Sequence, residues 1–210
     1  MIRKLLIAIA LLCVSSASAE EHDYIVKDVH FASGESMPEV RMHYVTMGTP
    51  QRDAKGVVRN AVLVLHGTTG SSKQFLGDNF AGVLFAPGGL LDASRYFIVI
   101  PDNIGHGKST KPSDGLHARF PRYAYADMID LQHRLLVEGL GVDHLYLVIG
   151  TSMGAMHAWM WGEQWPDFMD ALVPLASLPA QIAGRNRVWR KMAIDDIRND
   201  PEWHGGEYKE

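Results

Sequence analysis

The stretch Leu-Tyr-Leu-Val-Ile-Gly-Thr-Ser-Met-Gly-Ala-Met, residues 145–156, decides the fold class of this 210-residue chain. Its first five residues form an apolar run that predicts a buried strand, and the apolar spacing over 153–165 predicts a helix directly after it. Between them stands Gly150-x-Ser152-x-Gly154, the spacing of a sharp strand-to-helix turn that lifts a serine hydroxyl above a parallel sheet. A side chain at either glycine would crowd such a turn. The pattern therefore predicts Ser152 as a catalytic nucleophile.

Strands and helices alternate along the rest of the chain. Apolar runs predict strands over 24–31, 40–46, 60–65, 96–100 and 171–176, and helical spacing predicts helices over 123–140 and 182–198. This alternation is typical of an α/β fold, with a mostly parallel sheet flanked by helices. No repeat or linker interrupts the chain, so we expect one domain over residues 20–210.

Residues 1–19 have the features of a secretory signal peptide. Arg3 and Lys4 form a basic start, residues 5–14 an apolar core, and Ala17-Ser-Ala19 a small-residue cleavage site. The apolar run is too short to span a bilayer, which argues against a stable membrane anchor. We expect cleavage after Ala19 and a secreted or periplasmic protein. Cleavage would remove the single cysteine, Cys13, and with it any disulfide or zinc–thiolate site.

Composition excludes several classes of partner. The net charge of −4 is mildly acidic, which argues against nucleic acid binding. The ten histidines include no His-Glu-x-x-His and no pair with obvious ligand spacing on one helix, so we expect no metal site. We expect no cofactor and a small-molecule ester as the binding partner. The oligomeric state is not determined by the sequence.

A serine nucleophile needs amide donors that stabilise the oxyanion formed by its attack. His66-Gly67-Thr68-Thr69-Gly70 follows the predicted strand 60–65 directly, and in sheets of this kind that loop supplies one backbone N–H. The residue after the nucleophile supplies the other. These positions are Thr68 and Met153, and Gly67 would let the backbone approach a substrate. The alternative is that residues 66–70 form only a tight turn.

Three other patterns have less specific interpretations. The segment 102–109, Asp-Asn-Ile-Gly-His-Gly-Lys-Ser, lacks phosphate-loop spacing and predicts a structured turn beside the site, with a structural His106. The Met and Trp side chains of 156–165 predict core packing. The charges of 185–198 predict a solvated face, with an anion-binding role for Arg185 or Arg187 as the alternative.

Together these motifs resemble the α/β-hydrolase superfamily. The chain is more specifically similar to the homoserine O-acetyltransferase branch, in residues 95–100, 150–156 and 193–208, the last of which resembles the start of that branch's lid. The likeness covers 40–208, with the lid beginning near 178. It implies an α/β-hydrolase fold, Ser152 as the nucleophile, and Thr68 and Met153 as the oxyanion donors.

The chain departs from that branch in two ways. The branch uses acetyl-CoA in the cytosol, whereas this chain carries an export signal, which favours water as the acyl acceptor. The superfamily places its acid and histidine on later strands, so we expect a chain truncated before the last strands and nearly inactive alone. His157 should point away from Ser152, and His204 is a weak candidate base. The leading hypothesis is a serine hydrolase acting on a carboxylic ester, and the alternatives are an acyltransferase of the homoserine type or an inactive chain.

Overall fold

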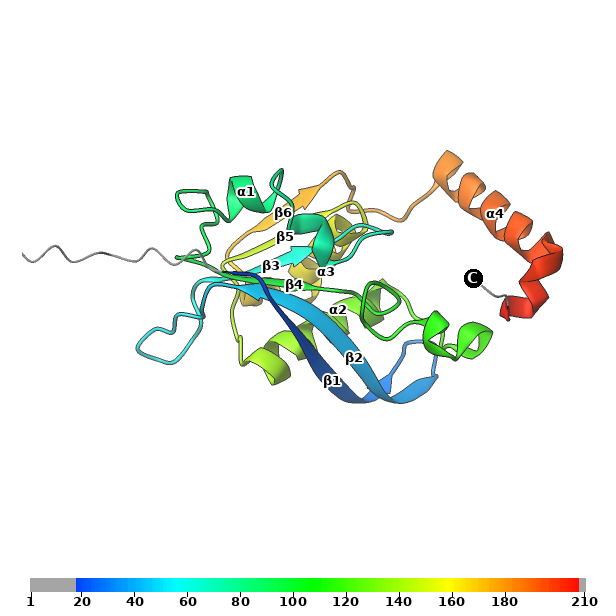
Figure 1. Cartoon of the computed structure of the whole chain (residues 1–210), viewed down its shortest axis with the longest axis horizontal. Coiled ribbons are helices and arrows are strands. Elements are labelled where there is room, and N and C mark those ends of the chain that lie inside the picture. The colour runs from blue at the N-terminus through cyan, green and yellow to red at the C-terminus, as the bar shows by residue number, and fades with distance from the viewer. Residues whose placement is uncertain (1–17, 208–210) are drawn as a thin grey trace, which may run out of the picture.

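The computed structural model describes residues 18–207 and shows one six-stranded sheet flanked by helices (Figure 1). The strands are β1 (Glu20–His30), β2 (Ser36–Met47), β3 (Ala61–Leu65), β4 (Phe97–Pro101), β5 (Leu147–Thr151) and β6 (Leu172–Leu175). They lie in the order β1-β2-β4-β3-β5-β6. β4, β3, β5 and β6 run parallel, while β2 pairs antiparallel with both β1 and β4. The predicted α/β class with a mostly parallel sheet is confirmed.

The described residues contain four α-helices and several short helical turns. The helices are α1 (Ala81–Leu84), α2 (Tyr125–Arg134), α3 (Met153–Gln164) and α4 (Gly184–Asn199). The 3₁₀ turns are η1 (Ser72–Phe75), η2 (Pro112–Asp114), η3 (His117–Arg119), η5 (Pro166–Phe168) and η6 (Pro201–Gly206), and η4 (Leu135–Gly139) is a π-helical turn.

The predicted elements are present, with two differences in extent. The first two strands are longer than predicted, because the hairpin pairs from Glu20 opposite Thr46 to His30 opposite Ser36. The helix predicted over 123–140 ends at Arg134 and continues as the π turn η4. Gly139 of that turn packs against the Tyr24 ring, where a Cβ would lie 3.0 Å from Tyr24 Cγ. The short helices between residues 72 and 119 escaped prediction because single turns leave no measurable periodicity.

The central strand β3 is buried on both faces, and its residues alternate between two cores. Val62 and Val64 pack on the face covered by η1 and α1, with Phe75 and Phe85. Leu63 and Leu65 pack on the opposite face, which α2 and α3 cover; the same core contains Ile129, Ala158 and Trp161. The sheet is therefore covered by helices on both faces. In such a sheet the loops at the carboxyl ends of the strands form the binding site.

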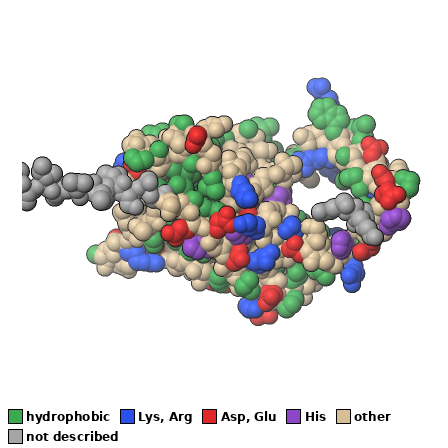
Figure 2. All heavy atoms as spheres, in the orientation of Figure 1, with side chains coloured by type: hydrophobic (Ala, Val, Ile, Leu, Met, Phe, Trp, Pro, Cys, Tyr) green, Lys and Arg blue, Asp and Glu red, His purple; other side chains and the backbone are tan. Residues whose placement is uncertain are grey.

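The segment after β6 leaves the sheet. Helix α4 has no buried residue, and Figure 1 shows it apart from the sheet. Its charges are solvated as predicted, and its apolar side chains are exposed too: Val188, Trp189, Met192, Ile194 and Ile197. The chain then returns through η6, where a Cβ on Gly206 would lie 2.6 Å from Ala118 Cβ. Figure 2 shows the open space between this segment and the rest of the molecule.

The turn between β5 and α3 brings three backbone segments into close contact. A Cβ on Gly150 would lie 2.1 Å from the carbonyl oxygen of Gly154, and a Cβ on Gly154 would lie 2.1 Å from the carbonyl oxygen of Leu65. Both distances are far below van der Waals contact, and backbone atoms cannot move aside as a flexible side chain can. The predicted requirement for glycine at both positions is confirmed.

Replacing either glycine by alanine should destabilise the fold. We expect Gly150→Ala and Gly154→Ala to lower the free energy of unfolding by about 1–3 kcal/mol or more, since overpacking forces the backbone apart. Urea unfolding followed by circular dichroism measures this loss. Gly77→Ala is the matched control, because the nearest atom to a Cβ there is Asn79 Oδ1 at 3.8 Å. Equal midpoints for the three variants would contradict the steric argument.

The signal-peptide prediction lies almost wholly on residues 1–17, which are outside the described range, as is Tyr208 of the lid-like motif.

Candidate active site

Ser152 lies in the turn between the end of β5 and the start of α3. Its backbone has φ 52 and ψ −112, a conformation that a residue with a side chain rarely adopts. The Ser152 N–H donates to the carbonyl oxygen of Leu175 at 2.9 Å, which ties the turn to β6. The side chain is exposed. A strained, exposed serine between a buried strand and a helix has the geometry expected of a nucleophile elbow.

The loop after β3 lies directly against this turn. A Cβ on Gly67 would be 3.5 Å from Ser152 Cβ. The loop is closed by a hydrogen bond from the Gly70 N–H to the Gly67 carbonyl oxygen, 3.0 Å long. The structure therefore brings together the two segments that the sequence analysis paired.

An open groove runs between these segments. Ser152 and Thr68 both line it, together with Gly67, Thr69, Gly70, Ser71, Lys73, Gln74, Thr151 and Ala176. Met153 is buried, and its N–H is at the first position of the 12-residue helix α3. The first N–H groups of a helix have no partner within it and carry a partial positive charge. The groove thus has an exposed hydroxyl, a helix N-terminus and the loop that carries the Thr68 amide.

Gln74 bridges the two sides of the groove. Its Nε2 donates to Thr151 Oγ1 at 3.2 Å, and its Oε1 accepts from the Gly67 N–H at 3.4 Å. Gly70 leaves room for this side chain, because a Cβ there would lie 2.3 Å from Gln74 Oε1. No motif in the sequence indicated Gln74.

The segment 102–109 is a structured turn, as predicted. The Asp102 carboxylate accepts from the backbone N–H of Ser72 at 2.6 Å and of Lys108 at 2.8 Å. Gly107 has φ 51, and a Cβ there would lie 2.0 Å from Asp102 Oδ2. His106 contacts the 66–70 loop, with Nε2 2.6 Å from the Thr68 carbonyl oxygen. The turn therefore supports the Thr68 loop.

No histidine or carboxylate within residues 18–207 is hydrogen-bonded to the Ser152 hydroxyl. His157 is fully buried, and its Nδ1 lies 3.2 Å from Gln132 Nε2. Burial, with a smaller contribution from His66 and His106, lowers the pKa of His157 to about 3. His204 is exposed on η6 and lies 3.9 Å from Glu202. Among the described residues, no group of three or more His, Cys, Asp or Glu side chains could hold a metal ion.

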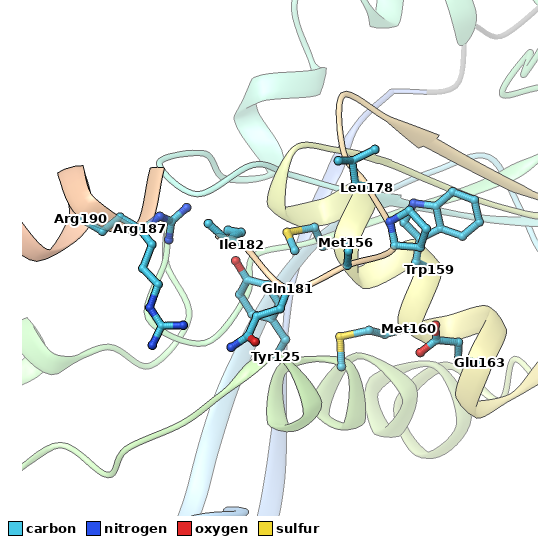
Figure 3. Close-up of a pocket in the computed structure, with 12 residues that line it drawn as sticks. Tyr125, Met156, Trp159, Met160, Glu163, Leu178, Gln181, Ile182, Arg187 and Arg190 are labelled. Atoms are coloured by element: carbon cyan, nitrogen blue, oxygen red, sulfur yellow. The ribbon is translucent and has the colours of Figure 1, made fainter. Parts of the chain in front are cut away.

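A second cavity lies under α3, where the sequence analysis predicted only core packing. Trp161 is buried in the core, but Met156, Trp159 and Met160 line this cavity with Tyr125 of α2. Figure 3 shows Arg187 and Arg190 approaching it from α4. The prediction of core packing is confirmed for Trp161 and for Trp165 and Met160, which pack against the core. It was wrong for Met156 and Trp159, because the loop 176–183 lines the other side of the cavity instead of packing onto them.

No helix in the described part of the chain is both long and apolar enough to cross a bilayer.

Comparison with known proteins agrees with the fold. Residues 60–208 match the family model of the alpha/beta hydrolase fold. The chain is 36% identical over 191 residues to a homoserine O-acetyltransferase of Thermobifida fusca, covering 84% of this chain and 48% of the relative. It is 33% identical over 182 residues to a probable acyltransferase of Methanothermobacter thermautotrophicus, covering 86% and 55%. Among solved structures, the acetyl esterase MekB superposes with a TM-score of 0.78 at 27% identity, covering 90% of this chain and 53% of the esterase.

The chain belongs to the α/β-hydrolase family. Its relatives and structural neighbours include both homoserine O-acetyltransferases and esterases, which confirms the resemblance stated from the sequence. The chain spans about half the length of the curated relatives it matches.

The buried histidine makes the fold sensitive to acid. The unfolded chain protonates His157 near pH 6.5, whereas the folded chain resists protonation down to about pH 3. The unfolded state therefore binds more protons between these values, and the free energy of unfolding should fall by up to ~1.4 kcal/mol per pH unit as the pH drops through this window. Urea titrations at pH 7, 6, 5 and 4 measure the slope. We expect His157→Gln to reduce it, whereas the exposed His30→Gln should leave it unchanged. Identical slopes in all three proteins would contradict this assignment.

Proposed function

We propose that this protein is a serine hydrolase that cleaves a carboxylic ester through an acyl-Ser152 intermediate. The observation that carries the proposal is the position of Ser152. Its hydroxyl is exposed on a backbone at φ 52, in a groove shared with the Thr68 loop and at the N-terminus of α3. Serine in that conformation is costly and is retained at sites where the strain serves a function.

The chemistry follows from the groups around the groove. The Ser152 oxygen would attack the ester carbonyl and lose its proton to a base, and the alcohol would leave with a proton. Water would then release the acid from the acyl enzyme. The amides of Thr68 and Met153 would stabilise the oxyanion in both steps, and one such donor is typically worth about 3 kcal/mol in the transition state.

An acyltransferase is the second candidate. It is favoured by relatives named homoserine O-acetyltransferase at 32–36% identity. The two activities share the acyl enzyme and differ only in whether water or a second hydroxyl accepts the acyl group. We favour water because the likeness extends to an acetyl esterase and an acetylester hydrolase at TM-scores of 0.78 and 0.75, and because the export-like N-terminus separates the protein from cytosolic acetyl-CoA.

The test uses the natural reading frame that contains this chain. We expect it to hydrolyse a short-chain nitrophenyl ester, and Ser152→Ala to lower kcat by at least about 10³-fold, as loss of a nucleophile does. A parallel assay offers acetyl-CoA and homoserine. Equal ester hydrolysis by the two proteins would overturn the proposal, and acetyl transfer to homoserine without ester hydrolysis would establish the second candidate. No activity of either kind would favour an inactive chain.

We also propose export with cleavage after Ala19. β1 begins at Glu20, so removal of residues 1–19 would leave every strand intact. Expression with the native N-terminus, followed by cell fractionation and N-terminal sequencing, tests this. We expect the protein outside the cytoplasm and a mature chain starting at Glu20. An intact Met1 in the cytoplasmic fraction would refute export.

A further inference from the structure

A chain of buried polar side chains crosses the molecule beneath the groove. His66, Asn103 and Gln132 are all completely buried, and they come from the end of β3, the turn after β4, and α2. Buried polar groups carry a free-energy cost unless each is hydrogen-bonded. The proposed chemistry does not use these three side chains directly, so their hydrogen bonds must serve to hold other groups in place.

The direction of each hydrogen bond is determined by one backbone amide. The Asn103 N–H donates to His66 Nε2 at 3.0 Å, so that nitrogen must carry a lone pair. The ring proton is therefore on Nδ1, which donates to the Gly67 carbonyl oxygen at 2.8 Å. Burial lowers the pKa of His66, which keeps the ring in this neutral form.

The same reasoning orients the two side-chain amides. Asn103 Nδ2 lies 3.2 Å from the unprotonated His66 Nε2, so Asn103 Oδ1 faces Gln132 and accepts from its Nε2 at 2.5 Å. Gln132 Oε1 in turn accepts from Trp161 Nε1 at 2.8 Å. Every donor in this chain meets an acceptor, from α3 through α2 to the loop after β3.

This chain of hydrogen bonds ends on the peptide group between Gly67 and Thr68, which carries the proposed oxyanion donor. The carbonyl of Gly67 and the N–H of Thr68 belong to one planar trans peptide, so fixing the carbonyl fixes the direction of the N–H. The His66 ring holds this carbonyl from one side, and the Gly70 N–H holds it from another. His106 contacts the following carbonyl, that of Thr68.

We propose that Asn103 and Gln132 are positioning residues that act through His66 to aim the Thr68 amide at the oxyanion formed on Ser152. This inference rests on the proposed function of Ser152. Gln132 anchors the Asn103 side chain, whose Nδ2 contacts His66 Nε2 beside the Asn103 backbone N–H that fixes the tautomer, and His66 orients the Gly67–Thr68 peptide.

The kinetic test is Gln132→Met, which keeps the side-chain volume and removes the hydrogen bonds to Asn103 and Trp161 together with the contact to His157 Nδ1. An interaction made only in the transition state affects kcat rather than KM. We expect Gln132→Met to lower kcat for ester hydrolysis by about 10-fold or more, toward the 10²–10³-fold typical of a lost oxyanion donor, with KM changed by less than about 2-fold. Asn103→Asp should lower kcat at least as much, because a carboxylate oxygen cannot donate to His66 Nε2.

Met169→Ala is the matched control for lost stability. Met169 belongs to the buried core and pairs with Leu145 in an isolated bridge before β5 begins, away from the Ser152 turn that follows that strand. The urea midpoints of the two variants are measured first, and the assay is run where both are folded. Equal losses of kcat in Gln132→Met and Met169→Ala would show that the His66–Asn103–Gln132 network has only a structural role, which would overturn the proposal.

A spectroscopic readout separates this inference from the proposed function. Nitrogen NMR of histidine-labelled protein should show His66 as a neutral ring protonated on Nδ1. We expect this signal and the Thr68 amide resonance to shift in Gln132→Met and to be retained in Met169→Ala. Unchanged His66 ring-nitrogen and Thr68 amide resonances in Gln132→Met would overturn the positioning role, whatever the activity. If these NMR changes occur but ester hydrolysis does not depend on Ser152, only the proposed function is refuted.

Discussion

The close contact of bare backbone at Gly150, Gly154 and Leu65 is the constraint on which the rest of this structure depends. Because a Cβ on Gly154 would lie 2.1 Å from the Leu65 carbonyl oxygen, α3 can start immediately above the end of β3 only if that residue is glycine. This packing places the N-terminus of α3 beside the 66–70 loop. It also forces the intervening residue, Ser152, into the left-handed region at φ 52. The exposure of one hydroxyl is thus a consequence of backbone packing two residues away on either side.

The loop opposite Ser152 is held by polar rather than apolar contacts. The Asp102 carboxylate accepts one backbone N–H from Ser72 of η1 and one from Lys108 of its own turn. The His66–Asn103–Gln132 network connects the loop to α2 and, through Trp161, to α3. Such buried networks rigidify a site when every member is satisfied. His157 carries an associated cost, because its Nε2 is buried without a hydrogen-bond partner. Because Gln132 Nε2 lies 3.2 Å from His157 Nδ1, the acid-sensitive histidine contacts the same buried network that supports the loop.

The family relationship explains why two activities, ester hydrolysis and acyl transfer, are both candidates for this site. An esterase and an acyltransferase both need a serine, a pair of amide donors and a strained turn, since both form the same acyl enzyme. They differ in the molecule that accepts the acyl group, and that choice is made by the surfaces around the groove rather than by the elbow. The fold is accordingly shared by the acetyl esterase and the homoserine O-acetyltransferases to which this chain is similar.

The sequence by itself determined the fold class, the position of the elbow and the pairing of Ser152 with the 66–70 loop. These features have strong local signals: apolar runs, helical spacing and glycines at fixed offsets. Tertiary structure alone decided which polar residues meet beneath the groove. Asn103 and Gln132 are 29 residues apart. Asn103 belongs to the predicted turn 102–109 but its partner could not be read from that pattern, and Gln132 belongs to no motif, although a glutamine on the buried face of the predicted helix 123–140 was an available signal. Tertiary structure also decided that Met156 and Met160 line a cavity, because burial of a helix face depends on what packs against it, and the loop after β6 leaves that face open.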